Sequence, residues 1–358
     1  CKDAQGGIVS HQLLDSGVNQ YWGHSYVRLL MEVEVPPYGY STYVVTETDE
    51  FQPPIRYPGD PRLEEPDCFV LENEHIKVVL DTMNCAVVSL LDKDTGAELV
   101  TPQRPAGIFR LIQEDPRYGM TSWRVGRYMT IEDLTADMHV LGFQKGGLRQ
   151  SVTYRIKFND SQLDVTVSLD KGSRSLNYDV RCDWQERGRP GENIPQLNFY
   201  APVSYQCAAY RYDVPFGIID RKPIDMDVPG NSFIAGIRGG AASSHLMLVT
   251  DSKYGYRGFD NALAVSLIRG SYDPDRYPDI GFHHFRLALC AAPAAASKQE
   301  LIQQAYDWNH PLTVISSPPQ ERGSWPLAHG FIQLEAGTVA VSAVKMPEGG
   351  QGKEMLIR

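Results

Sequence analysis

The segment between residues 148 and 184 constrains the fold of this chain most strongly. It contains three runs in which apolar and polar residues alternate, Leu148–Phe158, Leu163–Leu169 and Ser175–Trp184. Short polar turns separate them, Asn159–Ser161 and then Asp170–Ser173. Alternation with a period of two buries one side of each strand, and turns this short join antiparallel neighbours. The segment therefore predicts a β-meander in an antiparallel sheet.

A hairpin is predicted between Leu71 and Val100. Ile76–Leu80 alternates in polarity, the polar residues 81–84 reverse the chain, and Val87–Leu91 resumes before the turn at residues 92–96. Further strand patterns follow at residues 107–113, 246–250, 262–268 and 281–290. With so little helical pattern between them, these strands predict a mainly β chain built on a large, strongly twisted antiparallel sandwich.

One helix is predicted, from Lys298 to Tyr306. Ser297 and Glu300 have the spacing of a capping box, in which each residue satisfies a backbone N–H group of the first turn. Leu301 and Ala305 supply an apolar face, and Pro311 prevents further extension. We therefore expect very little helix in the chain.

Smaller β units are expected on either side of the sandwich. We expect a small β unit at 1–50, a linker rich in proline and acidic residues at 51–67, the large sandwich at 68–310, and a small C-terminal β unit at 311–358. The expected strands of the small units are Ile8–Leu14, Tyr26–Val35, Ser41–Val45, Phe331–Glu335 and Thr338–Lys345. Because the chain opens on CKDAQGGIV and closes on a strand-like pattern, we expect it to be part of a longer protein.

Charge and cysteine content exclude several classes of partner. The 44 acidic and 34 basic side chains give a net charge of −10, without an extended basic stripe, so neither nucleic acid nor anionic membrane is an expected partner. No apolar run approaches the roughly 18 residues needed for a membrane span. The 6 cysteines lack zinc-finger spacing and are expected to be free thiols in a reducing compartment, the cytoplasm.

Histidines and carboxylates give no clear catalytic pattern. His283 and His284 are neighbours in a predicted strand, so their rings point to opposite faces and cannot bind one metal together. His11, His24 and His75 also lack ligand spacing, so no metal site is expected within this chain. A pair of catalytic carboxylates cannot be recognised from sequence, because its defining feature is a distance in space.

The stretch Asp251–Phe285 is more suggestive of ligand binding. Aromatic faces are supplied by residues such as Tyr254, and polar groups by Asp260, Asn261 and Arg269. A sugar stacks its C–H face on an aromatic ring while its hydroxyls form hydrogen bonds, so this composition suits a polyhydroxylated ligand. The alternative interpretation is that the tyrosines pack at the ends of strands.

Five motifs together resemble the C-terminal half of the α-mannosidases of glycoside hydrolase family 38. They are LENEHIKVVLDTMNCAVVSLLDKDTGAELV (71–100), YDVPFGIIDRKP (212–223), LVTDSKYGYRGFDNALAVSLIRGSYDPD (248–275), HFRLALCA (284–291) and VAVSAVKMPEGGQGKEMLIR (339–358). The patch EVEVPPYGYSTYVV is similar to the family's entry into that half. The resemblance implies a super-sandwich of the galactose-mutarotase-like type, flanked by small β-sandwich units.

The resemblance also implies that the catalytic groups lie in another domain. In the family, an N-terminal domain supplies the divalent metal, usually zinc, together with the nucleophile and the acid/base. We therefore expect no catalytic residue, metal or other cofactor in this chain. Its parent would be a retaining α-mannosidase, and this part alone would be inactive. The expected partners are that catalytic domain and an α-mannoside substrate, and a homo-oligomer is left open.

For substrate binding, the resemblance points to Arg269, supported by Asp260 and Asn261, with Tyr254 nearby. An arginine offers a rigid fork of donors to carboxylates or sugar hydroxyls. The chain departs from the family in EDPRYGMTSWRVGRY, where Trp123 keeps the aromatic position but Thr121 and Ser122 replace the usual neighbours. Two alternatives remain: a mutarotase- or epimerase-like enzyme using His283 or His284 with a carboxylate, and a carbohydrate-binding module.

Overall fold

The computed structural model describes residues 1–18, 23–46, 68–239, 244–277, 279–293, 295–318, 323–335, 341–352 and 354–358. The linker predicted at 51–67 lies outside these residues. The chain divides into two compact units. The small unit comprises Cys1–His11, Met31–Phe51 and Val314–Arg358, and the large unit comprises Gln12–Leu30 and Gln52–Thr313.

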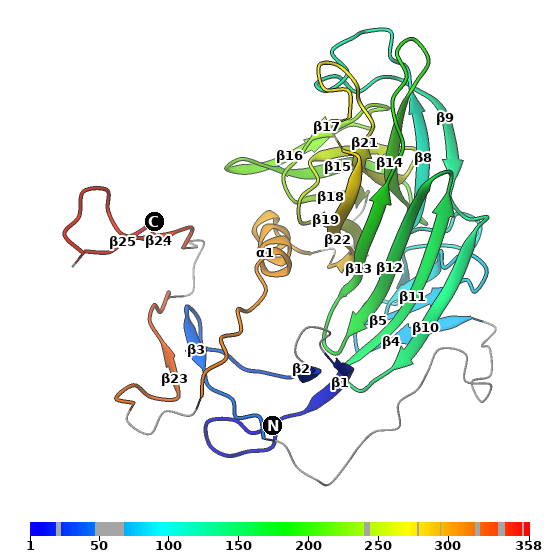
Figure 1. The fold of residues 1–358 in the computed structure, drawn as a ribbon. Helices are drawn as coiled ribbons and strands as arrows, with labels where there is room; N and C mark the ends of the chain where they lie inside the picture. Colours follow the sequence, from blue (N-terminus) through cyan, green and yellow to red (C-terminus); the bar gives the residue numbers. More distant parts are fainter. Residues whose placement is uncertain are drawn as a thin grey trace. The chain divides into compact units, whose positions relative to one another are not determined.

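The large unit contains a nine-stranded sheet, a six-stranded sheet and a four-stranded sheet (Figure 1). The nine-stranded sheet has the order β10 (Met138–Lys145), β11 (Arg149–Phe158), β12 (Ser161–Asp170), β13 (Ser175–Trp184), β22 (Gly281–Ala292), β19 (His245–Thr250), β18 (Phe233–Arg238), β15 (Cys207–Val214) and β16 (Gly217–Arg221). The six-stranded sheet has the order β17 (Val228–Pro229), β20 (Gly255–Phe259), β21 (Ala262–Arg269), β14 (Ile194–Pro202), β8 (Ile108–Glu114) and β9 (Tyr128–Asp133). The four-stranded sheet consists of β4 (Phe69–Glu72), β5 (Ile76–Leu80), β6 (Val87–Asp92) and β7 (Ala97–Glu98).

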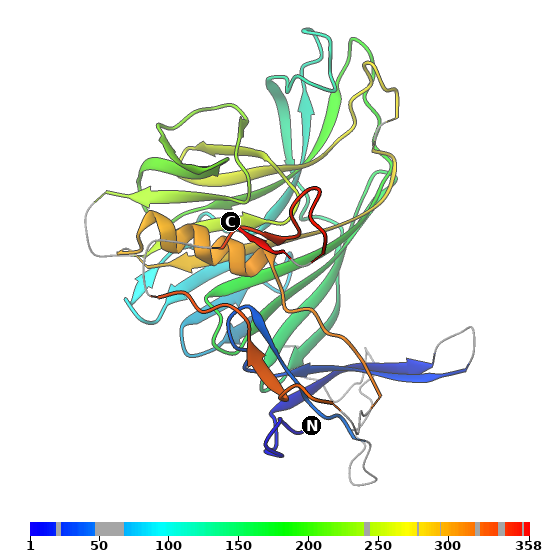
Figure 2. The ribbon, with the colours of Figure 1, turned by 90° about the vertical axis from the view of Figure 1, so that its left-hand side faces the viewer.

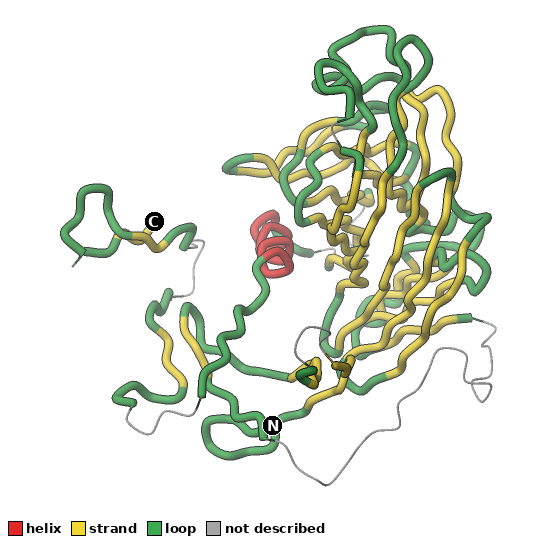
Figure 3. Tube along the Cα trace, viewed as in Figure 1, coloured by secondary structure: helices red, strands yellow, loops and turns green. Residues whose placement is uncertain are grey.

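Both predicted strand motifs are confirmed. The meander forms adjacent antiparallel strands β11, β12 and β13, in register from Phe158 opposite Ser161 to Leu169 opposite Leu176. The hairpin forms β5 and β6, and β4 and β7 extend it on either side. The mainly β, antiparallel fold with very little helix is likewise confirmed, as the strand-dominated trace in Figure 3 illustrates.

The main core of the large unit is built by residues from all three sheets. Val165 and Val167 of β12, Leu197 and Phe199 of β14, and Ile76 of β5 are fully buried members of one apolar cluster. Each such side chain contributes about 1.5–3 kcal/mol when it leaves water. On β14, Gln196 and Asn198 alternate with Leu197 and Phe199 and so face the other side of the six-stranded sheet, yet they are buried as well.

The predicted helix is present as α1 (Lys298–Asn309) and is the one helix among the residues the structure describes. The capping box is confirmed: the Glu300 N–H donates to Ser297 Oγ at 3.2 Å, and the Ser297 N–H donates to Glu300 Oε2 at 2.6 Å. Leu301 and Ala305 pack against a second apolar cluster on β18, β19 and β22. The helix therefore covers part of the outer face of the nine-stranded sheet (Figure 2).

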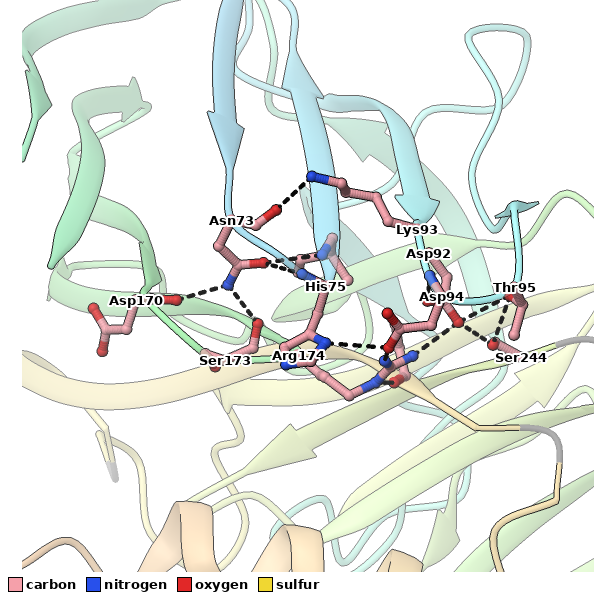
Figure 4. Close-up of polar contacts among 12 residues, drawn as sticks. Asn73, His75, Asp92, Lys93, Asp94, Thr95, Asp170, Ser173, Arg174 and Ser244 are labelled. Carbon is pink, nitrogen blue, oxygen red and sulfur yellow. Dashed lines mark hydrogen bonds and ion pairs between the residues drawn. The ribbon is translucent and has the colours of Figure 1, made fainter. Parts of the chain in front are cut away.

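A polar cluster joins the four-stranded sheet to the nine-stranded sheet (Figure 4). Asp92, at the end of β6, accepts hydrogen bonds from Thr95 Oγ1 at 3.0 Å, from Ser244 Oγ, and from Arg174 Nη2 at 2.8 Å. Arg174 also donates to the backbone oxygen of Ala291 at 2.8 Å and pairs with Asp94. Burial raises the pKa of Asp92, but the Ser244 and Arg174 contacts outweigh it and leave the pKa below its ordinary value.

The remaining strands pair in two-stranded sheets. β1 (His11–Val18) and β2 (Ser25–Met31) form a two-stranded sheet. In the small unit, β3 (Gly39–Ser41) pairs with β23 (Ala328–Gly330), and β24 (Val344–Lys345) pairs with β25 (Leu356–Ile357). N-terminal and C-terminal segments thus share one sheet.

The strand expected at Phe331–Glu335 is wrong. Phe331 donates one backbone hydrogen bond to Tyr38 at 3.2 Å, and the ladder then stops. The opposing residues Pro36 and Pro37 have no backbone N–H, so they cannot continue it. Of the expected strand Thr338–Lys345, the first three residues lie outside the described part of the chain, and β24 is its last two residues.

Candidate functional site

Arg269 forms a buried ion pair with Glu114, a partner that the sequence did not suggest. The two residues end β21 and β8, which lie on either side of β14 in the six-stranded sheet. Arg269 Nε donates to Glu114 Oε1 at 2.8 Å and Nη2 donates to Oε2 at 2.7 Å. Their side chains are 16% and 0% exposed. Burial lowers the pKa of Arg269, but the two hydrogen bonds and the charge of Glu114 outweigh it and raise the pKa above its ordinary value.

The same guanidinium holds the loop that follows Glu114, residues 115–127. Arg269 Nη1 donates to the backbone oxygen of Thr121 at 3.0 Å, and Nη2 donates to that of Arg124 at 2.9 Å. Four hydrogen bonds of this arginine are therefore directed to its own chain, where the sequence suggested a free fork for a ligand. The hydrogen bonds of Arg269 therefore hold this loop in place.

A second loop, residues 270–277, is tied to the first. The hydroxyl of the buried Thr121 accepts hydrogen bonds from the backbone N–H groups of Tyr272 and Asp273, both at 2.9 Å. The Ser122 N–H donates to the backbone oxygen of Asp273 at 2.9 Å. Figure 1 shows the two loops together at the upper end of the large unit. Thr121 and Ser122 thus join the two loops, together with the Met120 N–H, which donates to Asp273 Oδ2 at 2.9 Å.

Large side chains project from these loops into solvent. Trp123 is 67% exposed, and Tyr118, Met120 and Tyr277 are also exposed. The Arg187 guanidinium lies 5.0 Å from the centre of the Tyr277 ring. Flat aromatic faces beside fixed polar groups are suited to a sugar ring, which needs stacking and hydrogen bonding together.

Asp260 and Asn261 do not support Arg269, and that expectation is wrong. They form the turn before β21, with φ of 51° and 52°, whereas Arg269 ends the same strand. Because a strand rises about 3.3 Å per residue, the two ends of β21 are roughly 23 Å apart. Asp260 instead pairs with Arg104 at 3.0 Å, and Asn261 Oδ1 accepts the Cys207 N–H at 2.9 Å.

Tyr254 lies nearer to Arg269. It precedes β20, which pairs with β21 so that Gly255 is opposite Ser266. Its side chain is exposed, and its backbone oxygen accepts the Gly230 N–H at 3.1 Å. The structure therefore places Trp123, Tyr254 and Arg269 toward the same end of the six-stranded sheet.

The two neighbouring histidines face different surroundings. His283 Nε2 lies 2.7 Å from the backbone oxygen of Asp279. His284 Nε2 lies 3.1 Å from both carboxylate oxygens of Asp179, and these two side chains are 57% and 49% exposed, whereas His283 is half-buried. An epimerase would need such a pair inside a pocket, so this exposed location does not favour that alternative.

Metal ligands are not gathered anywhere in the part of the chain that the structure describes. Within it, no three His, Cys, Asp or Glu side chains lie close enough to bind a metal ion. The described residues therefore do not fit the metal that the resemblance implies for the parent, and no catalytic step is assigned to one here. A search of the same residues for a helix long and apolar enough to cross a membrane found none.

Comparison with known proteins supports the resemblance. Residues 71–277 match the family model for the glycosyl hydrolases family 38 C-terminal domain. Alpha-mannosidase 2C1 of Mus musculus is 26% identical over 295 residues, which are 78% of this chain and 27% of that protein. Alpha-mannosidase G of Dictyostelium discoideum is 20% identical over 339 residues, which are 89% of this chain and 30% of that protein. The chain thus spans under a third of the length of these curated relatives.

Solved structures agree on the fold. An alpha-mannosidase from Enterococcus faecalis V583 superposes with a TM-score of 0.73 at 15% identity, covering 99% of this chain and 44% of that one. A glycosyl hydrolase family 38 protein from Enterococcus faecalis gives a TM-score of 0.74 at 15% identity, with coverage of 99% and 46%. With the family model matching more than half of its residues, the chain belongs to the glycosyl hydrolase family 38 C-terminal domain family.

Proposed function

We propose that this chain is the non-catalytic C-terminal part of an α-mannosidase and completes the sugar site of a catalytic domain in the same polypeptide. The observation that carries the proposal is the buried Arg269–Glu114 pair, which fixes a loop bearing the exposed Trp123. The names of the curated relatives support the substrate class, a terminal α-mannoside. Trp123 is the residue assigned to stack on the sugar, with Tyr254 at its edge.

The chemical step is assigned to the catalytic domain. By resemblance, that domain supplies a divalent metal, usually zinc in the family, together with the nucleophile and acid/base of a retaining mechanism. This chain would bind and orient the sugar without taking part in proton or glycosyl transfer. Its own activity on an α-mannoside should therefore be absent.

Two preparations test the proposal: this chain alone and the α-mannosidase polypeptide that contains it. With an aryl α-mannoside and added Zn²⁺, we expect turnover from the longer polypeptide and none from the chain alone. Metal-dependent turnover by the chain alone would refute the non-catalytic role, and anomerase or epimerase activity would favour the mutarotase-like alternative.

A substitution of Trp123 tests the site itself. Loss of an aromatic stacking contact worth about 1–1.5 kcal/mol corresponds to a rise in KM of roughly tenfold with kcat unchanged, because stacking binds ground state and transition state alike. Trp325→Ala is the matched control, since Trp325 is 65% exposed but belongs to the small unit. Unchanged kinetics in Trp123→Ala would remove the loop from the sugar site.

We also propose a reducing compartment, the cytoplasm, for the protein. All 6 cysteines lie in described parts of the chain and each is a free thiol. Four of them are buried, where they pack as small apolar side chains. A homo-oligomer remains a proposal, and sedimentation of the longer polypeptide tests it.

A further inference from the structure

The loop 115–127 has both of its ends in one buried polar network. Glu114 immediately precedes the loop and Tyr128 immediately follows it, and the two residues are opposite each other in β8 and β9. The Gln196 side chain lies between them: its Nε2 donates to Glu114 Oε1 at 2.7 Å, and its Oε1 lies 2.9 Å from the Tyr128 hydroxyl. The side-chain amide of Gln196 thus connects the two residues that flank the loop.

Neighbouring groups fix the orientation of that amide. Glu114 only accepts hydrogen bonds, so it requires the NH₂ end of Gln196. On the other side, Asn198 Nδ2 donates to Gln196 Oε1 at 3.2 Å, which requires the oxygen end there. Gln196 and Asn198 are both buried, so neither can exchange these partners for water.

A second ion pair anchors the far side of the network. Both Asp227 carboxylate oxygens lie within hydrogen-bonding distance of the Tyr128 hydroxyl, at 2.9 and 3.0 Å. Asp227 also accepts from Arg257 Nε at 2.9 Å and from Ser266 Oγ at 2.7 Å. The Arg257 guanidinium lies 3.5 Å from the centre of the Tyr128 ring, so the ring is held from its face and from its hydroxyl.

Such a network is costly to build. Two carboxylates and two guanidinium groups, those of Glu114, Asp227, Arg257 and Arg269, are withdrawn largely from water. Buried ion pairs of this kind are rarely more stabilising than apolar side chains of the same volume, and their best-attested use is to fix one arrangement over others. The arrangement fixed here is the path of the loop that carries Trp123.

We infer that Tyr128, Gln196 and Asp227 are positioning residues that set how the loop 115–127 presents Trp123 to a sugar. The inference rests on the proposed function for its ligand, but the positioning itself is a property of this chain. Tyr128→Phe removes the hydroxyl that lies between Gln196 Oε1 and the Asp227 carboxylate and has one proton to donate to either, and it leaves both with other partners, so the fold should persist. Gln196→Leu removes the bridge at similar volume.

The readout in this chain is the ¹⁹F resonance of 5-fluorotryptophan at position 123, assigned by its loss in Trp123→Phe. We expect the resonance to shift or broaden in Tyr128→Phe and Gln196→Leu. Tyr200→Phe is the matched control: Tyr200 lies on the same side of β14, and its hydroxyl accepts from Arg104 at 3.1 Å, outside the network. The control should leave the resonance unchanged.

In the longer polypeptide, Tyr128→Phe should raise KM for an aryl α-mannoside about fivefold with kcat unchanged, the effect of losing one hydrogen bond of ordinary strength. A merely structural role would lower the amount of active enzyme, and therefore apparent kcat, without moving KM. An unchanged Trp123 resonance in both variants would overturn the inference. A changed resonance with unchanged kinetics would support the positioning role and count against the proposed sugar site instead.

Discussion

Two aspartates that share one arginine provide a sharp test of how burial sets the strength of an ion pair. Arg174 bridges Asp92, whose side chain is 0% exposed, and Asp94, whose side chain is 47% exposed. Asp92 is the last residue of β6 and Asp94 lies two residues beyond it, so the two differ chiefly in their access to water. The substitutions Asp92→Ala and Asp94→Ala therefore remove the same chemical group from the same partner in two environments.

The expected costs differ several-fold. Asp92 accepts hydrogen bonds from Ser244, Thr95 and Arg174, and its removal leaves these donors without their common acceptor. Breaking a buried pair of this kind costs about 3–5 kcal/mol. Asp94 pairs with Arg174 and with His75 at 3.1 Å at the surface, where such pairs contribute about 0–1 kcal/mol.

Urea unfolding at pH 7, followed by circular dichroism, measures both. With an m-value of about 3 kcal/mol/M, Asp92→Ala should lower the midpoint by roughly 1 M or more, and Asp94→Ala by about 0.3 M or less. A double-mutant cycle with Arg174→Ala should give the larger coupling energy for Asp92. Equal destabilisation by the two alanine variants would refute the argument that burial decides the strength of this cluster.

Three further outcomes are expected. The pKa of Asp92 in the folded state lies below its unfolded value of about 3.9, so the contribution of Asp92 to stability is complete above that value and is lost as pH falls through the folded-state pKa. The difference in free energy of unfolding between wild type and Asp92→Ala should therefore narrow below about pH 4. A difference that stays constant with pH would contradict this. Ellman's reagent at pH 8 should modify the partly exposed Cys1 and Cys68 quickly. The four buried thiols should react only after unfolding, because burial raises their pKa to about 11 or 12. Rapid reaction of all 6 thiols would show that the core opens readily. Phe216→Asn should stabilise the protein by about 0.5–1 kcal/mol. Phe216 is 100% exposed and has a φ of 65°, a backbone conformation that asparagine adopts at lower cost. A lower unfolding midpoint in the variant would argue that the phenyl ring makes contacts that its exposure does not reveal.

Local patterns were sufficient to predict much of the fold. The meander from Arg149 to Trp184 follows from alternation and short polar turns, and the start of α1 follows from Ser297 and Glu300. In each case the determining interactions lie within a few residues of one another. The resemblance added the family, which the match over residues 71–277 confirms.

The candidate site depended on contacts that local sequence does not contain. Arg269 was identified, but its partner Glu114 is 155 residues away and adjoins it only through the strand order β21, β14, β8. The resemblance implied that Asp260 and Asn261 support Arg269, which follows them in the same motif. A strand carries such residues to opposite ends, since each residue adds about 3.3 Å of length.

The sequence by itself determined that this chain is mainly β, because period-two alternation, turn residues and a helix cap act over short distances. Only the tertiary structure decided what Arg269 does. Sheet register brings Arg269, Glu114 and Gln196 together from three strands, and burial then makes their hydrogen bonds hard to exchange for water. An arginine that the sequence suggested for a ligand is therefore, in the folded chain, mainly the support of the loop that carries Trp123.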